Sequence, residues 1–392
     1  MKQRTMAGLF AFVLAAGPAV SLCAADGVIK LGFSSSKSGN YSEVGTSASN
    51  GVEMAKQEIN AKNGLLIGGK HYTLDLVNVD NKSDQSAGTA NALALISQHQ
   101  VLAIVGPQNS GRAIAVGEVA NAFRTPLITP WSTAPQTTLN KPFVFRTTVM
   151  YDIQVTAITK FAVREWKAAK AAVLYDETSV DPDGMAKAFK QAFEKANGVG
   201  SVVAFESFRT GDTDFSRQLK TIINSGADFL YAPQYHRDIP LVVNQARKLG
   251  WKKPITGNNT WSVVDLAEKC GDVCKGLYFT GNFAAGGAEG KGKAFVDSYQ
   301  KMYKLMPDEV AALNYDSVYL IAEALRNMNE LTDNIVENRS KLRDQIAATK
   351  RFEGVTGTWG YLGTGDPQKC AVVIKIDDNG VLTSQEKVCP EG

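Results

Sequence analysis

VLAIVGPQNSGRAIAVGEVANAFRTPLITPWST, residues 101–133, is the stretch that decides the fold. Its apolar run 101–105 stops at a Gly-Pro pair, the polar loop 107–110 leads into a helical pattern, and a second apolar run, 126–129, precedes the loop 130–133. This order predicts strand, loop, helix, strand and loop. In an open parallel sheet both loops emerge at the carboxyl ends of strands, and this edge is where ligands bind.

The two loops carry groups that suit a small anion. Ser110 opens the helical pattern, so unpaired backbone N–H groups and the positive end of the helix dipole point into the crevice. The hydroxyls of Ser132 and Thr133 add further donors. A carboxylate suits this position. The alternative is that Ser110 only caps its own helix and that the second loop only ends a strand.

Length and composition predict a soluble protein of two domains. The 392 residues suffice for two hydrophobic cores, and 44% hydrophobic with 21% charged residues is typical of globular chains. Residues 1–25 predict a secretory signal, because Lys2 and Arg4 precede an apolar run too short to span a bilayer and small residues follow it. We expect cleavage after Ala25. The alternative, a lipoprotein modified at Cys23, conflicts with the bulky residue before that cysteine.

The charge of the mature chain argues against nucleic acid as a partner. Cleavage removes two basic residues and no acidic residue, so the formal net charge falls from +3 to +1. A chain so close to neutral has no basic patch that implies nucleic-acid binding. No later segment is apolar enough to predict a membrane-spanning helix.

Four cysteines remain in an oxidising compartment, and their positions predict two disulfides. A two-residue Asn-Gly turn pairs Asp378 with Val381, and the same register of the flanking strands places Cys370 opposite Cys389. Alternation makes the cysteine pair a hydrogen-bonded one, which is an unusual place for a bridge, so a one-residue bulge is the alternative. Four-residue spacing around a Gly-Asp turn does not suit zinc. The second bridge therefore joins Cys270 and Cys274.

No catalytic or cofactor-binding pattern accompanies these features. The sequence has no G-x-S-x-G elbow, no complete phosphate-binding loop and no dinucleotide fingerprint after its first strand. We therefore expect a binding protein with no catalytic residues, no cofactor and no metal. The three histidines are widely spaced and form no metal-binding pair: His71, His99 and His236.

The rest of the chain repeats the same alternation of strands and helices, which predicts parallel sheets with helices on both faces. We expect two doubly wound lobes, a hinge of several strands and a ligand cleft between the lobes. The first lobe is expected to comprise residues 26–148 and 276–350, and the second residues 149–275 and 351–392. The predicted strands are residues 28–34, 71–79, 101–105, 126–129, 171–175, 201–208, 228–232, 254–257 and 276–280.

Several motifs in this order resemble one known family. They are SGNYSEVG at 38–45, VGPQNS at 105–110, TPWST at 129–133, YDETSVDPDG at 175–184, DTDFSRQLKTIINSGADFLY at 212–231, FVDSYQKMY at 295–303 and NYDSVYLIAEAL at 314–325. Together they are similar to the leucine/isoleucine/valine-type substrate-binding proteins of ABC importers, which are type I periplasmic binding proteins. The resemblance implies a periplasmic monomer that carries a small-molecule ligand, an amino acid or an organic carboxylate, to a membrane permease.

The resemblance also implies roles for individual residues. The family's serine and threonine that hold the ligand carboxylate correspond to Ser110 and Thr133, in agreement with the helix-terminus argument. The family's first-loop aromatic corresponds to Val44, and Tyr41 nearby is the expected substitute. A family tyrosine of the second lobe matches Tyr235. The loop residues that complete the candidate set in the first lobe are Gln108, Asn109, Trp131 and Ser132.

Two departures from the family pattern leave the charge of the ligand open. The family's second-lobe aromatic falls at Val180 or Asp181, and the acidic residue that pairs with an amino group is replaced by Asn259. A buried ammonium group needs a carboxylate partner. Either Asp181 supplies that charge and the ligand is an amino acid, or the ligand is a carboxylate without an α-amine, with Asn259 at its far end. Aromatic character would then follow from the rings at positions 41, 131 and 235.

Three functions of different classes have to be distinguished for this sequence: a solute receptor, a sensor and an enzyme. A periplasmic solute receptor explains the signal, the two lobes and the missing catalytic groups. A sensor that docks onto a separate receptor uses the same fold, and genes for a permease and an ATPase beside this one would favour transport over sensing. An enzyme such as an amidase needs a nucleophile beside a general base, and the sequence shows no such combination.

Overall fold

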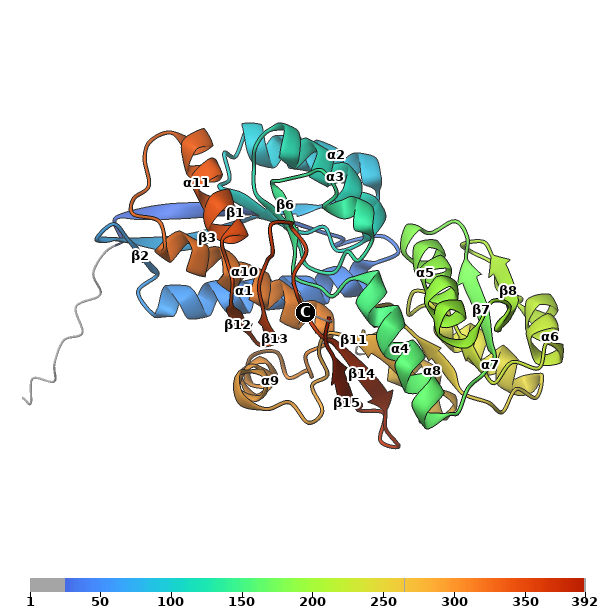
Figure 1. Cartoon of the computed structure of the whole chain (residues 1–392). Coiled ribbons are helices and arrows are strands. Elements are labelled where there is room, and N and C mark those ends of the chain that lie inside the picture. Colours follow the sequence, from blue (N-terminus) through green and yellow to red (C-terminus); the bar gives the residue numbers. More distant parts are fainter. Residues whose placement is uncertain (1–24, 264, 391–392) are drawn as a thin grey trace, which may run out of the picture.

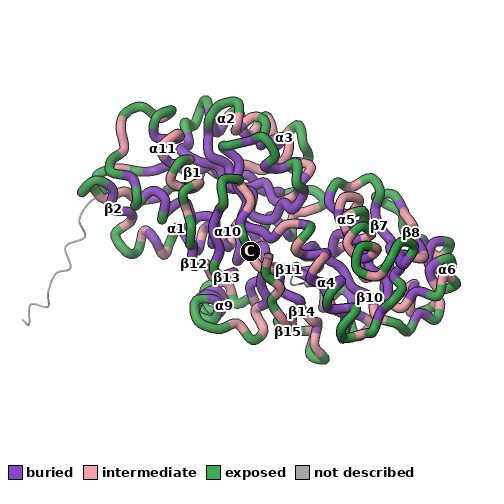
Figure 2. The backbone as a smooth tube through the Cα atoms, viewed as in Figure 1, coloured by how far each residue is buried: buried purple, intermediate pink, exposed green. Residues whose placement is uncertain are grey.

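The chain folds into two α/β bodies that lie side by side (Figure 1). The structure, a computed structural model, describes residues 25–263 and 265–390, so the predicted signal before Ala25 and the alternative lipid site Cys23 lie outside the described residues. Figure 2 shows buried backbone running through the middle of both bodies, where their sheets lie. The prediction of two sheet-based lobes is confirmed.

The first body is built on a six-stranded sheet with the order β2-β3-β1-β4-β5-β6. Only β2 runs antiparallel to its neighbour; the other neighbours pair in parallel. These strands are β1 (Gly27–Ser35), β2 (Leu65–Ile67), β3 (Lys70–Asp80), β4 (Ala103–Val105), β5 (Leu127–Thr129) and β6 (Val144–Arg146). Strands β4, β5 and β6 are buried along their whole length, as expected where helices cover both faces of a parallel sheet.

Helices cover both faces of this sheet. One hydrophobic core joins α1 and α10 to the sheet, and a second core joins α2 and α3 to it from the other side (Figure 1). Helix α9 packs against α1 and α10 through an aromatic cluster. The helices are α1 (Ser42–Ala61), α2 (Gln85–Ser97), α3 (Ser110–Ala122), α9 (Gly290–Tyr303), α10 (Glu309–Arg326) and α11 (Ile335–Ala347), with the short 3-10 turn η1 (Pro135–Thr137).

The second body has a seven-stranded sheet with the order β15-β14-β11-β10-β9-β7-β8. Helices α4 and α5 cover one face, and α6, α7 and α8 cover the other. Its strands are β7 (Ala171–Asp176), β8 (Val202–Phe208), β9 (Phe229–Tyr231), β10 (Ile255–Gly257), β11 (Tyr278–Gly281), β14 (Ala371–Ile376) and β15 (Leu382–Val388). Its helices are α4 (Tyr151–Glu165), α5 (Val180–Asn197), α6 (Ser216–Asn224), α7 (Ile239–Lys248) and α8 (Asp265–Cys270), with the 3-10 turns η2 (Asn259–Trp261) and η3 (Gly271–Cys274).

Two segments lie in the other body from the one that we expected. We assigned residues 276–281 to the first lobe, but β11 pairs with β10 and β14 and therefore extends the second sheet. We assigned residues 351–361 to the second lobe, but the hairpin of β12 (Phe352–Gly354) and β13 (Gly357–Trp359) buries aromatic rings in the first core. Sequence periodicity predicted β11 and did not predict β12 or β13. It does not show which of the two cores buries a strand.

Three segments of chain cross between the bodies. Residues 147–150 follow β6, residues 282–289 follow β11, and residues 360–370 connect β13 to β14. They touch one another, because Lys369 donates from Nζ to the carbonyl oxygen of Thr147 at 2.8 Å and Asn282 accepts from the backbone N–H of Val149 at 2.8 Å. The expected hinge of several strands is therefore confirmed.

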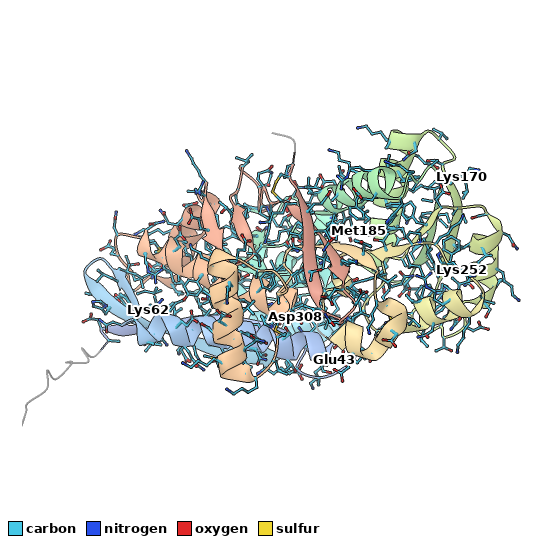
Figure 3. The ribbon with its side chains drawn as sticks, turned by 90° about the horizontal axis from the view of Figure 1, so that it is seen from below. Glu43, Lys62, Lys170, Met185, Lys252 and Asp308 are labelled. Carbon is cyan, nitrogen blue, oxygen red and sulfur yellow. A yellow bond between two sulfur atoms is a disulfide. The ribbon has the colours of Figure 1, made fainter. Side chains whose placement is uncertain are left out.

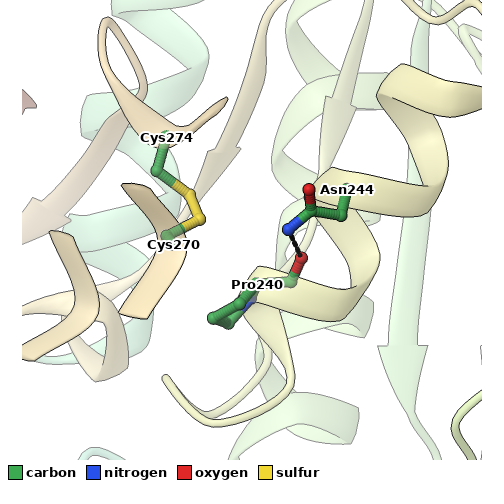
Figure 4. The surroundings of a disulfide bond; sticks show 4 residues. All are labelled: Pro240, Asn244, Cys270 and Cys274. Atoms are coloured by element: carbon green, nitrogen blue, oxygen red, sulfur yellow. Dashed lines mark hydrogen bonds between the residues drawn. A yellow bond between two sulfur atoms is a disulfide. The ribbon is translucent and has the colours of Figure 1, made fainter. Parts of the chain in front are cut away.

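Both predicted disulfides are present, one between Cys270 and Cys274 and one between Cys370 and Cys389. Figure 4 shows the first bridge beside α7, whose Asn244 donates from Nδ2 to the carbonyl oxygen of Pro240 at 2.8 Å. The bridge connects the end of α8 to the 3-10 turn η3. It therefore fixes the last turn of chain before β11.

The turn of the terminal hairpin differs from the two-residue turn that we predicted. The backbone N–H of Asp377 donates to Val381, and the three residues between them form the loop, with Gly380 at φ 79°. A three-residue hairpin loop with glycine in the left-handed region is the next most common solution. A register shift after Val373 then restores the expected alignment, so Ala371 pairs with Val388 and the cysteines beyond them meet. The bulge given as the alternative is thus confirmed.

Candidate functional site

The loops after β4 and β5 meet at the edge of the first sheet that faces the second body. Asn109 caps α3, because its Oδ1 accepts from the backbone N–H of Arg112. Ser110 is therefore not the cap, and its hydroxyl is available for other contacts. It accepts from the backbone N–H groups of Thr133 and Ala134 at 3.2 Å each, which joins the two loops. The alternative in which Ser110 only caps its helix is wrong.

A carboxylate does lie at this position, and it belongs to the chain itself. Asp181, in the first turn of α5 in the second body, accepts from the hydroxyl of Ser110 at 2.5 Å and from that of Thr133 at 3.0 Å. Tyr235 donates to its other oxygen at 2.7 Å, and Tyr151 donates at 3.0 Å. The backbone N–H of Ser110 contributes a further contact at 3.3 Å. Asp181 is 4% exposed, so these donors replace its water.

Two helix N-termini face each other across this carboxylate. Helix α3 begins at Ser110 in the first body, and α5 begins at Val180 in the second. The N-terminus of a helix carries a partial positive charge, so the two ends would repel each other if nothing lay between them. The negative charge of Asp181 offsets both ends. It therefore stabilises contact between the two bodies.

The tyrosines around Asp181 are protonated donors at neutral pH. Burial raises the pKa of Tyr235 well above its usual value, and the negative charge of Asp181 raises it further. The pKa of Tyr151 is raised well above its usual value for the same two reasons. Tyr235 also accepts from the Nδ2 of Asn109 at 2.5 Å. Both phenols can therefore donate to an anion but are not bases.

A second group of contacts joins the bodies near the start of α1. Glu43 receives Lys269 at 2.5 Å and His236 at 3.1 Å, and both partners belong to the second body. Figure 3 shows Glu43 at the end of α1 that faces the second body, while Lys62 marks the far end. The ring of Tyr41 packs edge-on against Tyr235 with centroids 5.2 Å apart. The guanidinium groups near the Tyr41 ring belong to Arg112, at 4.8 Å, and Arg237, at 5.5 Å.

Three other predicted residues hold the framework and make no hydrogen bond to Asp181 within the described parts of the chain. Gln108 donates to Asn314 at 3.3 Å, and Trp131 donates to Glu309 at 3.1 Å from within the first core. Ser132 lies between the hydroxyls of Ser110, at 2.9 Å, and Thr137, at 2.6 Å. We expected Trp131 in the cleft; its ring is buried beside the hinge instead.

Asn259 lies deeper in the second body. Its backbone N–H donates to Gln154 at 3.1 Å, and its Oδ1 accepts from the same side chain at 3.2 Å. Its Nδ2 is buried without a hydrogen-bond partner among the described residues. A buried amide donor without a partner is costly and is commonly explained by a ligand or a water. Asn259 thus retains a donor for a molecule that reaches this depth.

Sequence reasoning missed several residues of this interface. One of them is Tyr151, which contacts Asp181. The others are Glu43 and its two partners, His236 and Lys269, which lie 193 and 226 residues further along the chain. A lone tyrosine at the start of a helix and a lone glutamate in a first turn carry no local signal. The packing of α4 against α5 brings Tyr151 to Asp181, and the pairing of the two bodies brings Glu43 to its two partners.

Replacing Glu43 with Gln is expected to weaken the contact between the bodies. The hydrogen bond from Lys269, with a further one from His236, lowers the pKa of Glu43. The contact therefore stabilises the closed form while Glu43 is ionised, and this stabilisation is lost as the pH falls through the lowered pKa of Glu43. Because the side chain is 47% exposed, we expect a loss of only about 0.2–1 kcal/mol. Energy transfer between dyes on the two bodies would measure the closed fraction. Glu53→Gln, an intrahelical partner of Lys56 on the same helix, is the control, and equal closure in both variants would contradict the prediction.

Other features of the described residues do not compete with this interface. None of the described helices is long and apolar enough to cross a membrane. The described part of the chain holds no group of three or more histidine, cysteine or acidic side chains arranged for a metal ion. A cavity of 520 Å³ lies between α9 and the terminal hairpin, and another of 580 Å³ lies beside α4, but the converging donors and the buried carboxylate are at the interface between the bodies.

Comparisons with known proteins agree with the two-body architecture. The profile of the periplasmic binding protein family matches residues 28–381. A leucine-, isoleucine-, valine-, threonine- and alanine-binding protein of Pseudomonas aeruginosa is 27% identical over 381 residues, which cover 93% of this chain and 94% of that protein. The branched-chain amino acid transporter substrate-binding protein of Streptococcus pneumoniae, solved in complex with isoleucine, is 32% identical with a TM-score of 0.82 and coverage of 93% and 100%. A leucine-binding protein of Thermotoga maritima is 27% identical, with a TM-score of 0.82 and coverage of 92% and 99%.

Proposed function

The chain belongs to the periplasmic binding protein family, and on this basis we propose that it is the solute-binding component of an ABC importer. It captures a small polar solute between its two bodies and presents it to a membrane permease. It works as a monomer in the periplasm, after the signal at residues 1–25 has been removed. It needs no catalytic group for this task.

One observation carries the proposal: the polar groups of the interface are complete only when both bodies contribute. Ser110 and Thr133 come from the first body, whereas Asp181 and Tyr235 come from the second. A solute held between such groups has most of its contacts only in the closed form, so it shifts the equilibrium towards that form. The three-segment hinge allows this motion, and the permease can then distinguish the loaded protein by its shape.

The solute is small and polar, and three observations bear on the groups that it carries. The relative from Streptococcus pneumoniae binds isoleucine, which supports an amino acid or a related acid as a starting point. In this chain Asp181 fills the place that we predicted for a solute carboxylate with a carboxylate of its own. The buried donor of Asn259 favours an acceptor on the far end of the solute.

The experiment that tests this function combines binding with uptake. A solute that binds only the folded chain raises its melting temperature by mass action, so a thermal-shift screen of amino acids, organic acids and amides identifies it. Cells that lack this chain are then expected to lose high-affinity uptake of that solute and to regain it when the chain is restored. Unchanged uptake of the identified solute in the deletion strain would contradict a transport role.

A further inference from the structure

We infer that Asp181 determines the solute class by occupying the anion-binding position of Ser110 and Thr133, so that the cleft selects solutes that offer hydrogen-bond donors there, such as amides, and rejects carboxylates. This inference rests on the proposed function and narrows it. In this inference Asp181 is not the partner of an ammonium group of the solute. It occupies the anion-binding position itself.

The first step is that the position is already full. Ser110, Thr133, Tyr151 and Tyr235 all direct donors to the two oxygens of Asp181. A carboxylate has about four lone-pair sites, so its capacity is used. No hydroxyl of this group is left over for a second anion. A solute carboxylate would have to displace Asp181 from all of these donors at once.

The second step concerns charge. A second carboxylate beside Asp181 would place two like charges in a buried site, where one of them has to take up a proton or leave. Arg237 does not relieve this repulsion, because it already pairs with Asp238 at 3.4 Å. Arg112, which donates to the carbonyl oxygen of Ser83, and the buried Arg146 are cations that interact with the charge of Asp181. An uncharged solute keeps this balance.

The third step concerns donors and acceptors. An ionised carboxylate accepts hydrogen bonds and donates none, so a solute group that contacts Asp181 has to donate and has to take the place of one of its present donors. The phenol donors of Tyr151 and Tyr235 are the contacts that an incoming amide N–H group can replace, because it donates to the same oxygens. A carboxylate cannot make that exchange. The complementary group on the solute is therefore a donor.

The test compares acids with their own amides on the full mature chain. The probes are isoleucine with isoleucinamide, benzoate with benzamide, and 4-methylpentanoate with 4-methylpentanamide, with dissociation constants measured by calorimetry. In the unmodified chain each detectable amide is expected to bind at least tenfold more tightly than its acid. In Asp181→Ser, which vacates the anion position, the acids are expected to gain at least tenfold and the order is expected to reverse.

A matched control and a second variant keep the test decisive. Asp183→Ser changes a carboxylate in the same turn of α5 that pairs with Lys187 at 2.7 Å, and it is expected to keep the order of the unmodified chain. If Asp181→Ser does not fold, Asp181→Asn keeps the size and removes the charge, and the acids are again expected to gain.

Tighter binding of an acid than of its amide by the unmodified chain would overturn the inference, as would folded variants at Asp181 that gain nothing for acids. In both cases the receptor function would stand. If no acid or amide stabilises the chain or any variant, and the wider thermal-shift screen is also negative, the proposed function itself fails together with the inference.

Discussion

Replacing Lys369 with Met is expected to lower the free energy of unfolding by about 3–5 kcal/mol. Lys369 is 2% exposed and lies on the third crossing segment. Its ammonium group donates to the carbonyl oxygen of Thr147 on the first crossing and to the hydroxyl of Thr356 at 2.6 Å. Burial lowers the pKa of Lys369 to about 8, while the carboxylates of Asp316 and Glu309 oppose that shift.

The cost of this change comes from the partners that remain. Asp316 is fully buried and accepts from the backbone N–H groups of Val355 and Thr356 at 2.8 and 3.0 Å. Lys369 is the cation that acts on both Asp316 and Glu309, and an uncompensated buried charge is far more costly than a buried ion pair is favourable. Methionine matches the length of lysine, so a cavity contributes little to the expected loss.

Urea unfolding followed by circular dichroism measures this loss. Lys252→Met, at an exposed lysine of the second body, is the control and is expected to stay within about 0.5 kcal/mol. Adding Asp316→Asn to Lys369→Met removes one of the orphaned charges, so the double variant is expected to recover part of the stability. A loss below about 1 kcal/mol in the single variant would show that the three hinge segments do not depend on this charge.

The fold was predictable because its signals are local. The alternation around residues 101–133 predicted β4, α3 and β5 within one or two residues, and the strands predicted in the rest of the chain correspond to β1, β3, β7, β8, β9, β10 and β11. Asn63 and Gly64 have positive φ values just after α1 ends, a conformation that asparagine and glycine often adopt at helix C-termini. Assignment of β11 and of the β12–β13 hairpin to a body was not local, because it depends on which core buries them.

The candidate site was predictable only in part. Ser110, Thr133, Tyr235 and Asp181 are brought together, but their arrangement was not foreseen. Helix α5 begins at Val180, before Pro182, because proline is tolerated in a first turn and acidic residues suit it. That early start turns Asp181 towards the first body. The contacts of Lys369 and Glu309 span the three crossings, and no local pattern reports them.

The hinge contains a second ionisable group whose effect depends on pH. Burial raises the pKa of Glu309 to about 7, although hydrogen bonds from Asn282 and Trp131 lower it in part. In the unfolded chain this carboxyl loses its proton near its ordinary value of 4.5. Between these two values the folded chain holds a proton that the unfolded chain has lost. The stability that the protonated Glu309 gives to the folded chain is therefore complete below about pH 4.5 and is lost as the pH rises through about 7.

We expect Glu309→Gln to remove this pH dependence. A difference between 4.5 and about 7 corresponds to about 3 kcal/mol, so the unmodified chain should lose roughly that much stability, relative to the variant, between pH 4.5 and 8. Glutamine is uncharged, as the protonated carboxyl is, and its Oε1 can still accept from Trp131. Its Nε2 would face the backbone N–H of Asn282, a cost that does not change with pH. Urea midpoints measured at several pH values test this, with Glu323→Gln, at an exposed position of the same helix, as the control.

If the curves of Glu309→Gln and the unmodified chain stay parallel across this range, Glu309 is ionised in the fold, and its charge must then be balanced by Lys369.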